Sequence, residues 1–548
     1  MVYDFNRRQF LSITAGAIFL STVAAACGGT AGPDTGSEGN EVSGRSSDEP
    51  KRGGTLKIGL ESDFNSFAPP TGQFDPAGLI YASTVFDTLM ALDAEGKAQP
   101  NLAESMTPND DHTEFTMKLR SGIKFHDGTP LTSAEAVNAL TAVQTAALTG
   151  TSLLNLDTVK ATDDLTIVMT TKTSWPAFPT YLCGQLGYVP HPDTIATPEG
   201  GLAPIGTGPF VFEEWVQGSH FYATANAEYW QEGLPYVDRV EYTTISDSTS
   251  RENSLLAGTI DLMHSSDSIN QRNLKGNDQV QYLTDQDNQV GEPSMNMIMI
   301  NCKAPVVSDL RIRQALAYGF DNATYQEVQN FGLYEPAYGL FPGNPDYAES
   351  EKLYPRYDPE KAKSLVKEYE AEHGKASISY STTNTARQGQ VAQLLQQQFE
   401  AIGISLEIKQ MEQVQLITEA LMGNYQLAGW RSFNAPDPDA NYVWWSSHTS
   451  APIGESAVNF ARHEDPETQA ALDKGRTSLD EADRLAAYQK VNERFALDLP
   501  YIFTSRTVWG LYAAKKVENF NGRNLPDGAE ALSYFGGTFS AASTWLNA

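Results

Sequence analysis

The chain has 548 residues and a formal net charge of −30 at pH 7, from 38 Lys and Arg against 68 Asp and Glu. This acidic balance argues against nucleic acid as a partner, because the excess carboxylates leave no net positive charge to neutralise phosphates. A composition that is 41% hydrophobic and 10% aromatic is typical of a packed globular protein. Because single cores stop growing well below this length, we expect two or three lobes.

The amino-terminal stretch predicts an export signal. Arg7 and Arg8 precede an apolar segment, residues 10–23, that is too short and too rich in Ala, Ser and Thr to be a permanent membrane span. The paired arginines resemble the twin-arginine export motif, although Asn6 stands where Ser or Thr is usual, and the general secretion route stays open. The small residues before Cys27 resemble a lipobox, which implies a lipid on Cys27. The alternative is an ordinary small residue in a cleaved signal.

The next segment, residues 28–53, is predicted to be a flexible linker. It consists mostly of Gly, Ser, Thr, Asp, Glu and Pro, and Val42 is its only large aliphatic residue. Such a composition cannot bury enough apolar surface to offset the entropy of ordering. A lipid on Cys27 would therefore tether a folded body to the outer face of the cytoplasmic membrane.

The folded part begins with an expected strand. Apolar residues alternate over residues 55–60, and the polar stretch 61–70 follows. The carboxyl end of a first strand is where an open α/β sheet offers a ligand its surroundings, so Phe64 and Asn65 are candidate ligand contacts. An amphipathic helix is predicted over residues 79–90.

Further along, residues 115–119 show strand alternation, and residues 132–135 form a capping box that predicts the start of a helix. His126 and Asp127 could suggest catalysis. A Phe-His-Asp-Gly run before a capped helix is more typical of a turn, and no nucleophile accompanies it.

The carboxyl-terminal half shows β-α-β spacing. Residues 376–380 and 404–408 alternate as strands, with a helix face between them over 391–402. A helix over 414–422 and a strand over 426–430 extend the pattern. This spacing predicts parallel strands with a right-handed crossover in an open, doubly wound α/β sheet.

The loop after that last strand is the main candidate site, because ligands of open α/β sheets lie at the carboxyl ends of strands. Its aromatic rings could flank a solute and its polar groups could orient it. The alternative is that the rings cover a core. The candidate ligand-binding residues of this loop are Trp430, Phe433, Asn434, Asp437 and Trp444.

Several motifs, in order over residues 54 to about 512, resemble the family 5 extracellular solute-binding proteins, the peptide- and nickel-type receptors of bacterial ABC importers. The matching segments are residues 102–105, 115–120, 124–128, 131–137, 206–210, 229–230, 258–262, 309–316 and 357–362. The resemblance implies an α/β fold like that of type II periplasmic binding proteins, with two hinged lobes and an extra N-terminal subdomain.

The resemblance also implies a domain plan. After the export signal (1–27) and linker (28–53), we expect a first lobe, an extra subdomain packed on it, and a second lobe. Their ranges are 54–90, 205–290 and 503–548 for the first lobe, 91–204 for the subdomain and 291–502 for the second lobe.

One position departs from the resembled pattern. Peptide-binding members place an Asp in the loop, a few residues before an Asp-Pro pair, to bind the α-amino group of the peptide. Here Asn434 stands at that position, and a neutral amide lacks the charge that makes such a bond strong. Asp437 or Asp439 could replace the missing carboxylate. A peptide is the first expectation for the solute, with a nickel chelate, a sugar or another small organic solute as alternatives.

The expected function is therefore a monomeric, lipid-anchored receptor that closes on a small solute and delivers it to ABC importer permease subunits. The rival is a secreted hydrolase, but the sequence has no Gly-x-Ser-x-Gly or His-Glu-x-x-His motif. No His/Cys cluster has metal-ligand spacing, so we expect no metal site and no cofactor. Cys183 and Cys302 are either disulfide-bonded or two buried thiols.

Overall fold

The computed structural model describes residues 42–147, 149–285, 294–342, 344–432, 435 and 437–547. The predicted export signal with Cys27 lies outside these residues, as do Phe433 and Asn434 of the predicted ligand loop. The described chain forms three larger sheets, which define a seven-stranded, a four-stranded and a five-stranded region.

The seven-stranded sheet has the predicted first strand, β1, near its centre. Leu56, Ile58 and Leu60 are fully buried, which confirms that strand. β1 pairs in parallel with β10 and β11, and the remaining pairs are antiparallel. In sheet order the strands are β12 (Val280–Thr284), β18 (Gly510–Ala514), β11 (Leu262–Ser265), β1 (Thr55–Leu60), β10 (Arg239–Thr244), β9 (His220–Ala225) and β8 (Phe210–Val216).

The helix predicted over residues 79–90 is α1 (Pro76–Val85), and both its bounds and its amphipathic character were predicted wrongly. Asp75 caps its N-terminus by accepting a hydrogen bond from Gly78 N, with Pro76 at the first helical position. Most of its side chains are buried, because the helix packs inside the core of the seven-stranded region. The same region contains α5 (Ser248–Leu256), α6 (Ser268–Leu274) and the short strands β19 (Val517–Glu518) and β20 (Trp545–Leu546).

The four-stranded region has its own hydrophobic core. The predicted capping box is present: the side chain of Thr132 accepts from Ala134 N, and the Glu135 carboxylate accepts from Thr132 N at 2.9 Å. Its elements are β2 (Met90–Leu92) paired with β3 (Ala98–Pro100), the sheet β4 (Ala103–Pro108), β5 (Glu114–Leu119), β7 (Thr166–Thr171) and β6 (Leu156–Ala161), and helices α2 (Ser133–Thr145), α3 (Phe178–Tyr181) and α4 (Pro192–Ala196).

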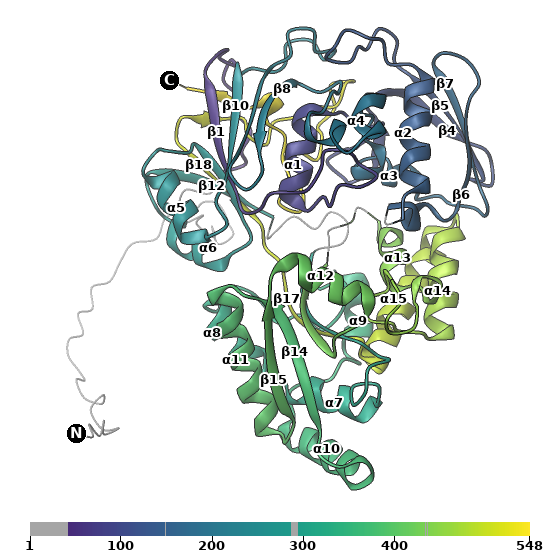
Figure 1. Cartoon of the computed structure of the whole chain (residues 1–548), viewed down its shortest axis with the longest axis vertical. Coiled ribbons are helices and arrows are strands. Elements are labelled where there is room, and N and C mark those ends of the chain that lie inside the picture. Colours follow the sequence, from purple (N-terminus) through teal and green to yellow (C-terminus); the bar gives the residue numbers. More distant parts are fainter. Residues whose placement is uncertain are drawn as a thin grey trace, which may run out of the picture. The chain divides into compact units, whose positions relative to one another are not determined.

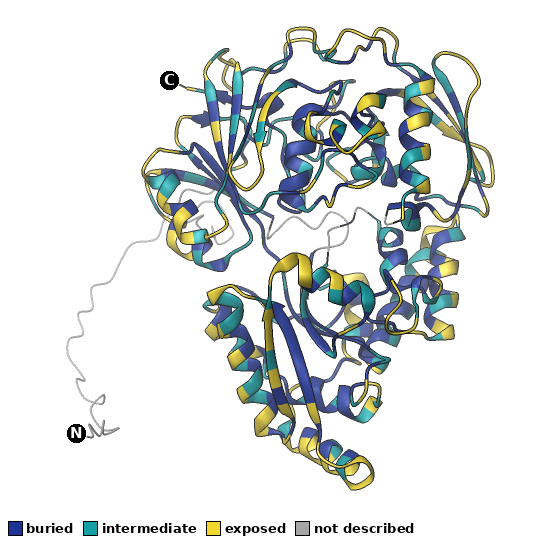
Figure 2. Cartoon of the chain, in the orientation of Figure 1, coloured by how far each residue is buried: buried dark blue, intermediate teal, exposed yellow. Residues whose placement is uncertain are grey.

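The five-stranded sheet contains the predicted parallel unit. β14 pairs in parallel with β15 and with β16, whereas β13 runs antiparallel to both β16 and β17. Figure 2 shows β14 as buried and β15, at the sheet edge, as partly exposed. In sheet order the strands are β15 (Ser405–Met411), β14 (Ser377–Thr383), β16 (Leu427–Arg431), β13 (Met295–Ile300) and β17 (Tyr501–Arg506).

Helices surround this sheet, and α11 lies along β14 and β15 (Figure 1). Asp358 caps the start of α10 by accepting from Lys361 N, and Gly374 ends the helix with a positive φ of 78°. The helices are α7 (Leu310–Gly319), α8 (Asn322–Asn330), α9 (Ala348–Glu351), α10 (Pro359–His373), α11 (Ala386–Ala401), α12 (Gln413–Met422), α13 (Tyr442–Trp445), α14 (Pro466–Thr477) and α15 (Glu481–Asp498).

Two predicted boundaries differ from the structure. The chain returns from the five-stranded to the seven-stranded sheet between Arg506 and Gly510, so a boundary at residue 503 would cut β17. The second half of the predicted linker also packs on the seven-stranded region. Val42 packs against its core and Val42 N donates to Tyr282 O at 2.8 Å, while Arg45 forms an ion pair with Glu530 at 2.8 Å.

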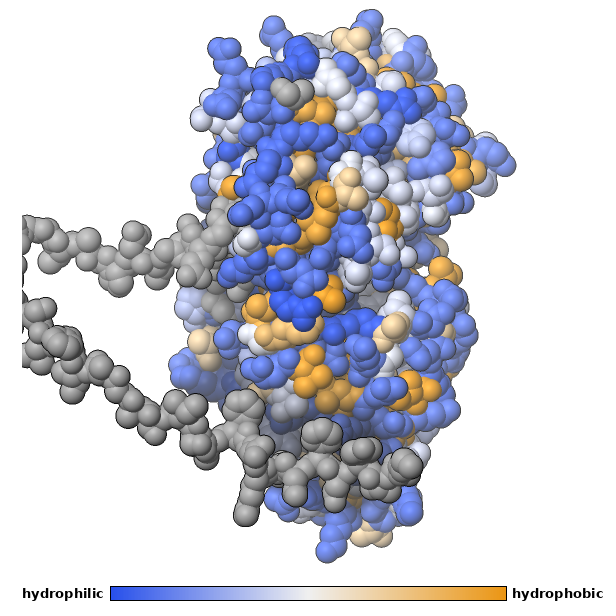
Figure 3. All heavy atoms as spheres, turned by 90° about the vertical axis from the view of Figure 1, so that its left-hand side faces the viewer, coloured by the Kyte–Doolittle hydropathy of each residue, from blue (hydrophilic) through white to orange (hydrophobic). Residues whose placement is uncertain are grey.

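The surface agrees with the polar composition. Figure 3 shows a face that is mostly hydrophilic with scattered hydrophobic residues. Among the residues that the structure describes, no helix is both long enough and apolar enough to cross a membrane.

Candidate functional site

Phe64 is a core residue, which corrects its prediction as a ligand contact. Only 7% of it is exposed. Its ring stacks on Tyr81 at 5.1 Å and packs edge-on against Phe67 at 4.7 Å, with Trp215 at 4.8 Å. The loop after β1 folds back onto α1, so this apolar ring points inward instead of lining a solute site.

Asn65 lies on the surface, but its amide is already used within its own loop. Asn65 Oδ1 accepts from Gln73 N at 2.8 Å, and Nδ2 donates to Thr71 O at 3.1 Å. These two bonds close the loop, and they give Asn65 a structural role.

Asp437 also has its partners inside the protein. It accepts from Asp439 N at 2.9 Å, which caps the short turn Pro438–Asn441, and it pairs with Arg484 at 2.6 Å. Burial raises the pKa of Asp437, and the Arg484 charge opposes that shift. A carboxylate so paired is not free to replace the missing Asp at position 434.

Asp439 is fully buried and is also paired. Its carboxylate accepts from Arg476 Nε at 2.7 Å and from Trp175 Nε1 at 2.5 Å. Neither alternative carboxylate of the loop is therefore available to a solute, whereas Phe433 and Asn434 stay predictions.

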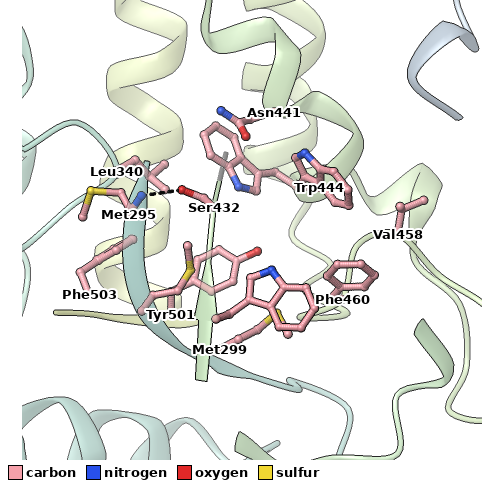
Figure 4. A pocket seen from close by; sticks show the side chains of 13 residues that line it. Met295, Met299, Leu340, Ser432, Asn441, Trp444, Val458, Phe460, Tyr501 and Phe503 are labelled. Carbon is pink, nitrogen blue, oxygen red and sulfur yellow. Dashed lines mark hydrogen bonds between the residues drawn. The ribbon is translucent and has the colours of Figure 1, made fainter. Parts of the chain in front are cut away.

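Trp430 and Trp444 line a pocket in the five-stranded region, beside the carboxyl end of β16. Both rings pack on Phe460, with ring centroids 5.1 and 5.4 Å away. Figure 4 shows the Tyr501 ring in the middle of the pocket, with Trp444 and Phe460 on one side of it and Met295 and Phe503 on the other. The pocket is lined by Met295, Met297, Met299, Leu340, Trp430, Ser432, Asn441, Trp444, Trp445, Val458, Phe460, Tyr501 and Phe503.

The chemistry of this pocket is apolar and uncharged. Ser432 Oγ accepts from Met295 N at 2.9 Å and so fixes the end of β16 to β13. Within the described residues, neither Trp430 Nε1 nor the Tyr501 hydroxyl makes a hydrogen bond, which leaves two donors for a solute. The cavity of ≈ 40 Å³ is far smaller than a whole-ligand pocket of roughly 300–1,000 Å³, so it can accept only one group of a solute.

Sequence reasoning missed most of the pocket wall. Met295, Met297 and Met299 alternate along β13 and therefore share one face of the strand, a pattern that was readable in the sequence. Phe460 and Tyr501 carried no comparable signal, because they reach the pocket from a loop and from β17.

A charged group joins the ends of two strands from different sheets. Arg431, the last residue of β16, donates to Ser266 Oγ at 2.8 Å and lies 3.4 Å from Glu61, which follows β1. Its guanidinium also lies over the Trp509 ring at 4.7 Å. Burial by itself raises the pKa of Glu61, but Arg431 and other nearby positively charged groups lower it more, so the pKa lies below its usual value. This contact connects the five-stranded and seven-stranded regions.

The other chemistry-bearing residues have structural roles. His126 contacts Gly208 O at 3.0 Å and accepts from Gly206 N at 3.3 Å, as expected for a histidine satisfied in a turn. Cys183 and Cys302 are free thiols, which decides against the disulfide alternative. Among the described residues, no group of three or more His, Cys, Asp or Glu side chains is placed to hold a metal ion.

Comparison with known proteins identifies the family. The model of the bacterial extracellular solute-binding proteins, family 5 Middle, matches residues 97–452. The chain belongs to this family. The resemblance expected from the motifs is thereby confirmed.

Individual relatives agree with this assignment. The family 5 chain is 26% identical over 474 residues to the glutathione-binding protein GsiB of Pectobacterium atrosepticum, covering 84% of this chain and 90% of that protein. Two solved structures match with a TM-score of 0.78. One is AgaA of A. tumefaciens R10 in complex with agropinic acid, 24% identical over 90% of this chain and 99% of that one. The other is DppA of Helicobacter pylori in complex with the peptide STSA, 22% identical over 91% and 99%. These matches confirm the α/β periplasmic-binding-protein fold.

Proposed function

We propose that this protein is the extracytoplasmic receptor of an ABC importer, which binds a peptide or peptide-like small solute and delivers it unchanged to the permease. The observation that carries the proposal is the uncharged pocket beside the carboxyl end of β16, where Trp430 Nε1 and the Tyr501 hydroxyl have no hydrogen-bond partner among the residues that the structure describes. Such a pocket suits one side group of a solute whose remainder extends beyond it.

The proposed solute contacts are Trp430 and Trp444 of the pocket, together with Phe433 and Asn434 of the loop that follows β16. Phe460 and Tyr501 join them as pocket walls. Phe64, Asn65 and Asp437 are left out because their rings and polar atoms are used inside the protein.

Capture is proposed to work by closure of the five-stranded region on the seven-stranded region. Among the described residues, a three-residue connection, 507–509, leads from β17 of the five-stranded sheet to β18 of the seven-stranded sheet. A solute favours the closed state only through contacts that are better there than in the open state. Residues of the seven-stranded region that reach a solute held in the pocket on closure would supply such contacts.

We also propose the location and the domain plan. The export signal and a lipid at Cys27 would place the protein as a monomer on the outer face of the cytoplasmic membrane, reached by the twin-arginine or the general route. Three domain bounds change from those expected: the second lobe extends to Arg506, the last segment of the first lobe begins after it, and the part of the linker from Val42 onward packs on the first lobe.

The relatives favour two solute classes. GsiB is named for glutathione and DppA holds a peptide, which supports a peptide-like solute. AgaA holds agropinic acid, and the neutral Asn434 would also suit a non-peptide solute. A non-peptide organic solute is therefore the second candidate.

The first experiment is native mass spectrometry of protein purified from its own host, because a closed site retains its solute. A ladder of peptide masses supports the first candidate, and one non-peptide mass supports the second. Recovery of a hydrolysed product after incubation with that solute would contradict the receptor role.

The second experiment tests the pocket. Trp430→Ala should weaken solute affinity by about 10- to 100-fold, as expected for an aromatic contact removed from a binding site. Tyr357→Ala is the matched control, because this exposed ring lies in the same region outside the pocket. Titration calorimetry measures both, and equal affinities in the two variants would remove Trp430 from the site.

A further inference from the structure

A buried polar cluster joins the four-stranded region to the five-stranded region. We call it the Asp439 cluster: Asp439 and Arg476 from the five-stranded region, and Trp175 and Tyr181 from the four-stranded region. Trp175 Nε1 donates to Asp439 Oδ2 at 2.5 Å, and Arg476 Nε donates to Oδ1 at 2.7 Å. The Tyr181 hydroxyl lies 3.0 Å from Oδ2 and accepts from Arg476 Nη2 at 3.1 Å. Every member is at least nine-tenths buried.

The cluster fixes the backbone as well as the side chains. The Tyr181 hydroxyl donates to the backbone carbonyl of Asp439 at 2.6 Å. Arg476 lies over the ring of Tyr442 at 3.6 Å, at the first residue of α13. Because a buried carboxylate is costly without its partners, this short segment has little freedom to move.

The fixed segment carries part of the pocket wall. Asn441 lies two residues after Asp439, and Trp444 and Trp445 follow in α13. A displacement of Asp439 would therefore move three pocket-lining residues together. Trp175 and Tyr181 do not themselves line the pocket.

We propose that Trp175 and Tyr181 are positioning residues for the solute pocket, acting through Asp439 on the segment 439–445. This inference rests on the proposed function, because it takes the pocket to be the solute site. It also gives the four-stranded region a part in solute capture, although the described pocket lies wholly in the five-stranded region.

The chain offers a control of matched chemistry. Asp87 is also buried, and it accepts from Trp230 Nε1 at 2.8 Å and from the Tyr229 hydroxyl at 3.0 Å. None of these three residues lines the pocket. Trp230→Phe and Tyr229→Phe therefore remove the same donors as Trp175→Phe and Tyr181→Phe, at a place without contact to the pocket wall.

The test compares these four single variants of the full chain by two readouts. The first is amide hydrogen exchange of residues 439–445 in the ligand-free protein, which reports local opening. The second is calorimetric binding of Ala-Phe-Ala, Ala-Leu-Ala and Ala-Ala-Ala. Urea unfolding of all four shows whether the loss of global stability is similar.

We expect Trp175→Phe and Tyr181→Phe to speed exchange in 439–445 and to weaken peptide binding, each by about 10- to 100-fold, the factor for a lost hydrogen bond to a charged group. Trp230→Phe and Tyr229→Phe should change neither. Unchanged exchange in 439–445 in both test variants would overturn the proposal, as would equal binding losses in test and control variants. If the wild type binds none of the three peptides, that result counts against the peptide class, and exchange alone decides the positioning role.

Discussion

Two buried aspartates receive the same kinds of neutral donor but serve different junctions. Asp87 accepts from Trp230, Tyr229 and Thr207, and burial raises its pKa. Asp439 accepts from a Trp and a Tyr as well, but its third contact is the Arg476 guanidinium. The three direct donors to Asp87 are neutral, and Trp230 also packs against the core of the four-stranded region. At Asp439 the donors from the four-stranded region are likewise neutral, and the added ion pair with Arg476 lies within the five-stranded region. A buried ion pair is far more costly to break than a neutral hydrogen bond.

The largest effect should come from removing the cation of the Asp439 cluster. Arg476→Met leaves a fully buried carboxylate without its counter-charge, so we expect unfolding free energy to fall by about 3–5 kcal/mol. Urea unfolding measures this loss. A loss below about 1 kcal/mol would mean that the neutral donors alone stabilise Asp439, as they do Asp87.

The next largest effect should be the pH dependence of stability that comes from Asp87. The folded pKa of Asp87 is raised above its usual value of 3.8, so the folded state binds its proton more tightly than the unfolded state. The stability from this group is complete below pH 3.8 and is lost as pH rises through the folded pKa. Asp87→Asn should remove that loss and flatten the slope by up to about 1.4 kcal/mol per pH unit. Urea unfolding from pH 4 to pH 8 tests this, and parallel curves for wild type and variant would contradict it.

The smallest effect should be at the third donor of Asp87. Thr207→Val deletes a neutral hydroxyl 3.2 Å from the carboxylate and keeps the side-chain shape, so about 1 kcal/mol should be lost. Solute affinity should not change. A loss as large as that of Arg476→Met would show that a neutral donor and a cation count equally at these sites.

Elements specified by local signals were predictable. The cap at Thr132, the Asp358 and Gly374 ends of α10 and the parallel pair β14 and β15 follow from residues a few positions apart. The error at α1 came from overlooking one such signal, the Asp75-Pro76 start.

The candidate site was only partly predictable. Trp430 and Trp444 line the pocket, in agreement with the expectation that ligands lie at the carboxyl ends of strands. The same expectation favoured Phe64, whose ring packs in the core. The sequence pattern of an aromatic residue at a strand end is the same whether the ring lines a pocket or packs in a core. Which way it points depends on the elements packed around it, here α1 and Trp215.

The sequence by itself determined the family, the α/β class and the order of most elements, because periodicity, caps and motif order are written locally along the chain. Tertiary structure alone decided which polar groups are hydrogen-bonded or ion-paired inside the protein and which remain available to a solute. Asp439 meets Trp175 across 264 positions of sequence, and Asp437 meets Arg484 across 47. Such pairings depend on how separately folded regions meet, which no local pattern encodes.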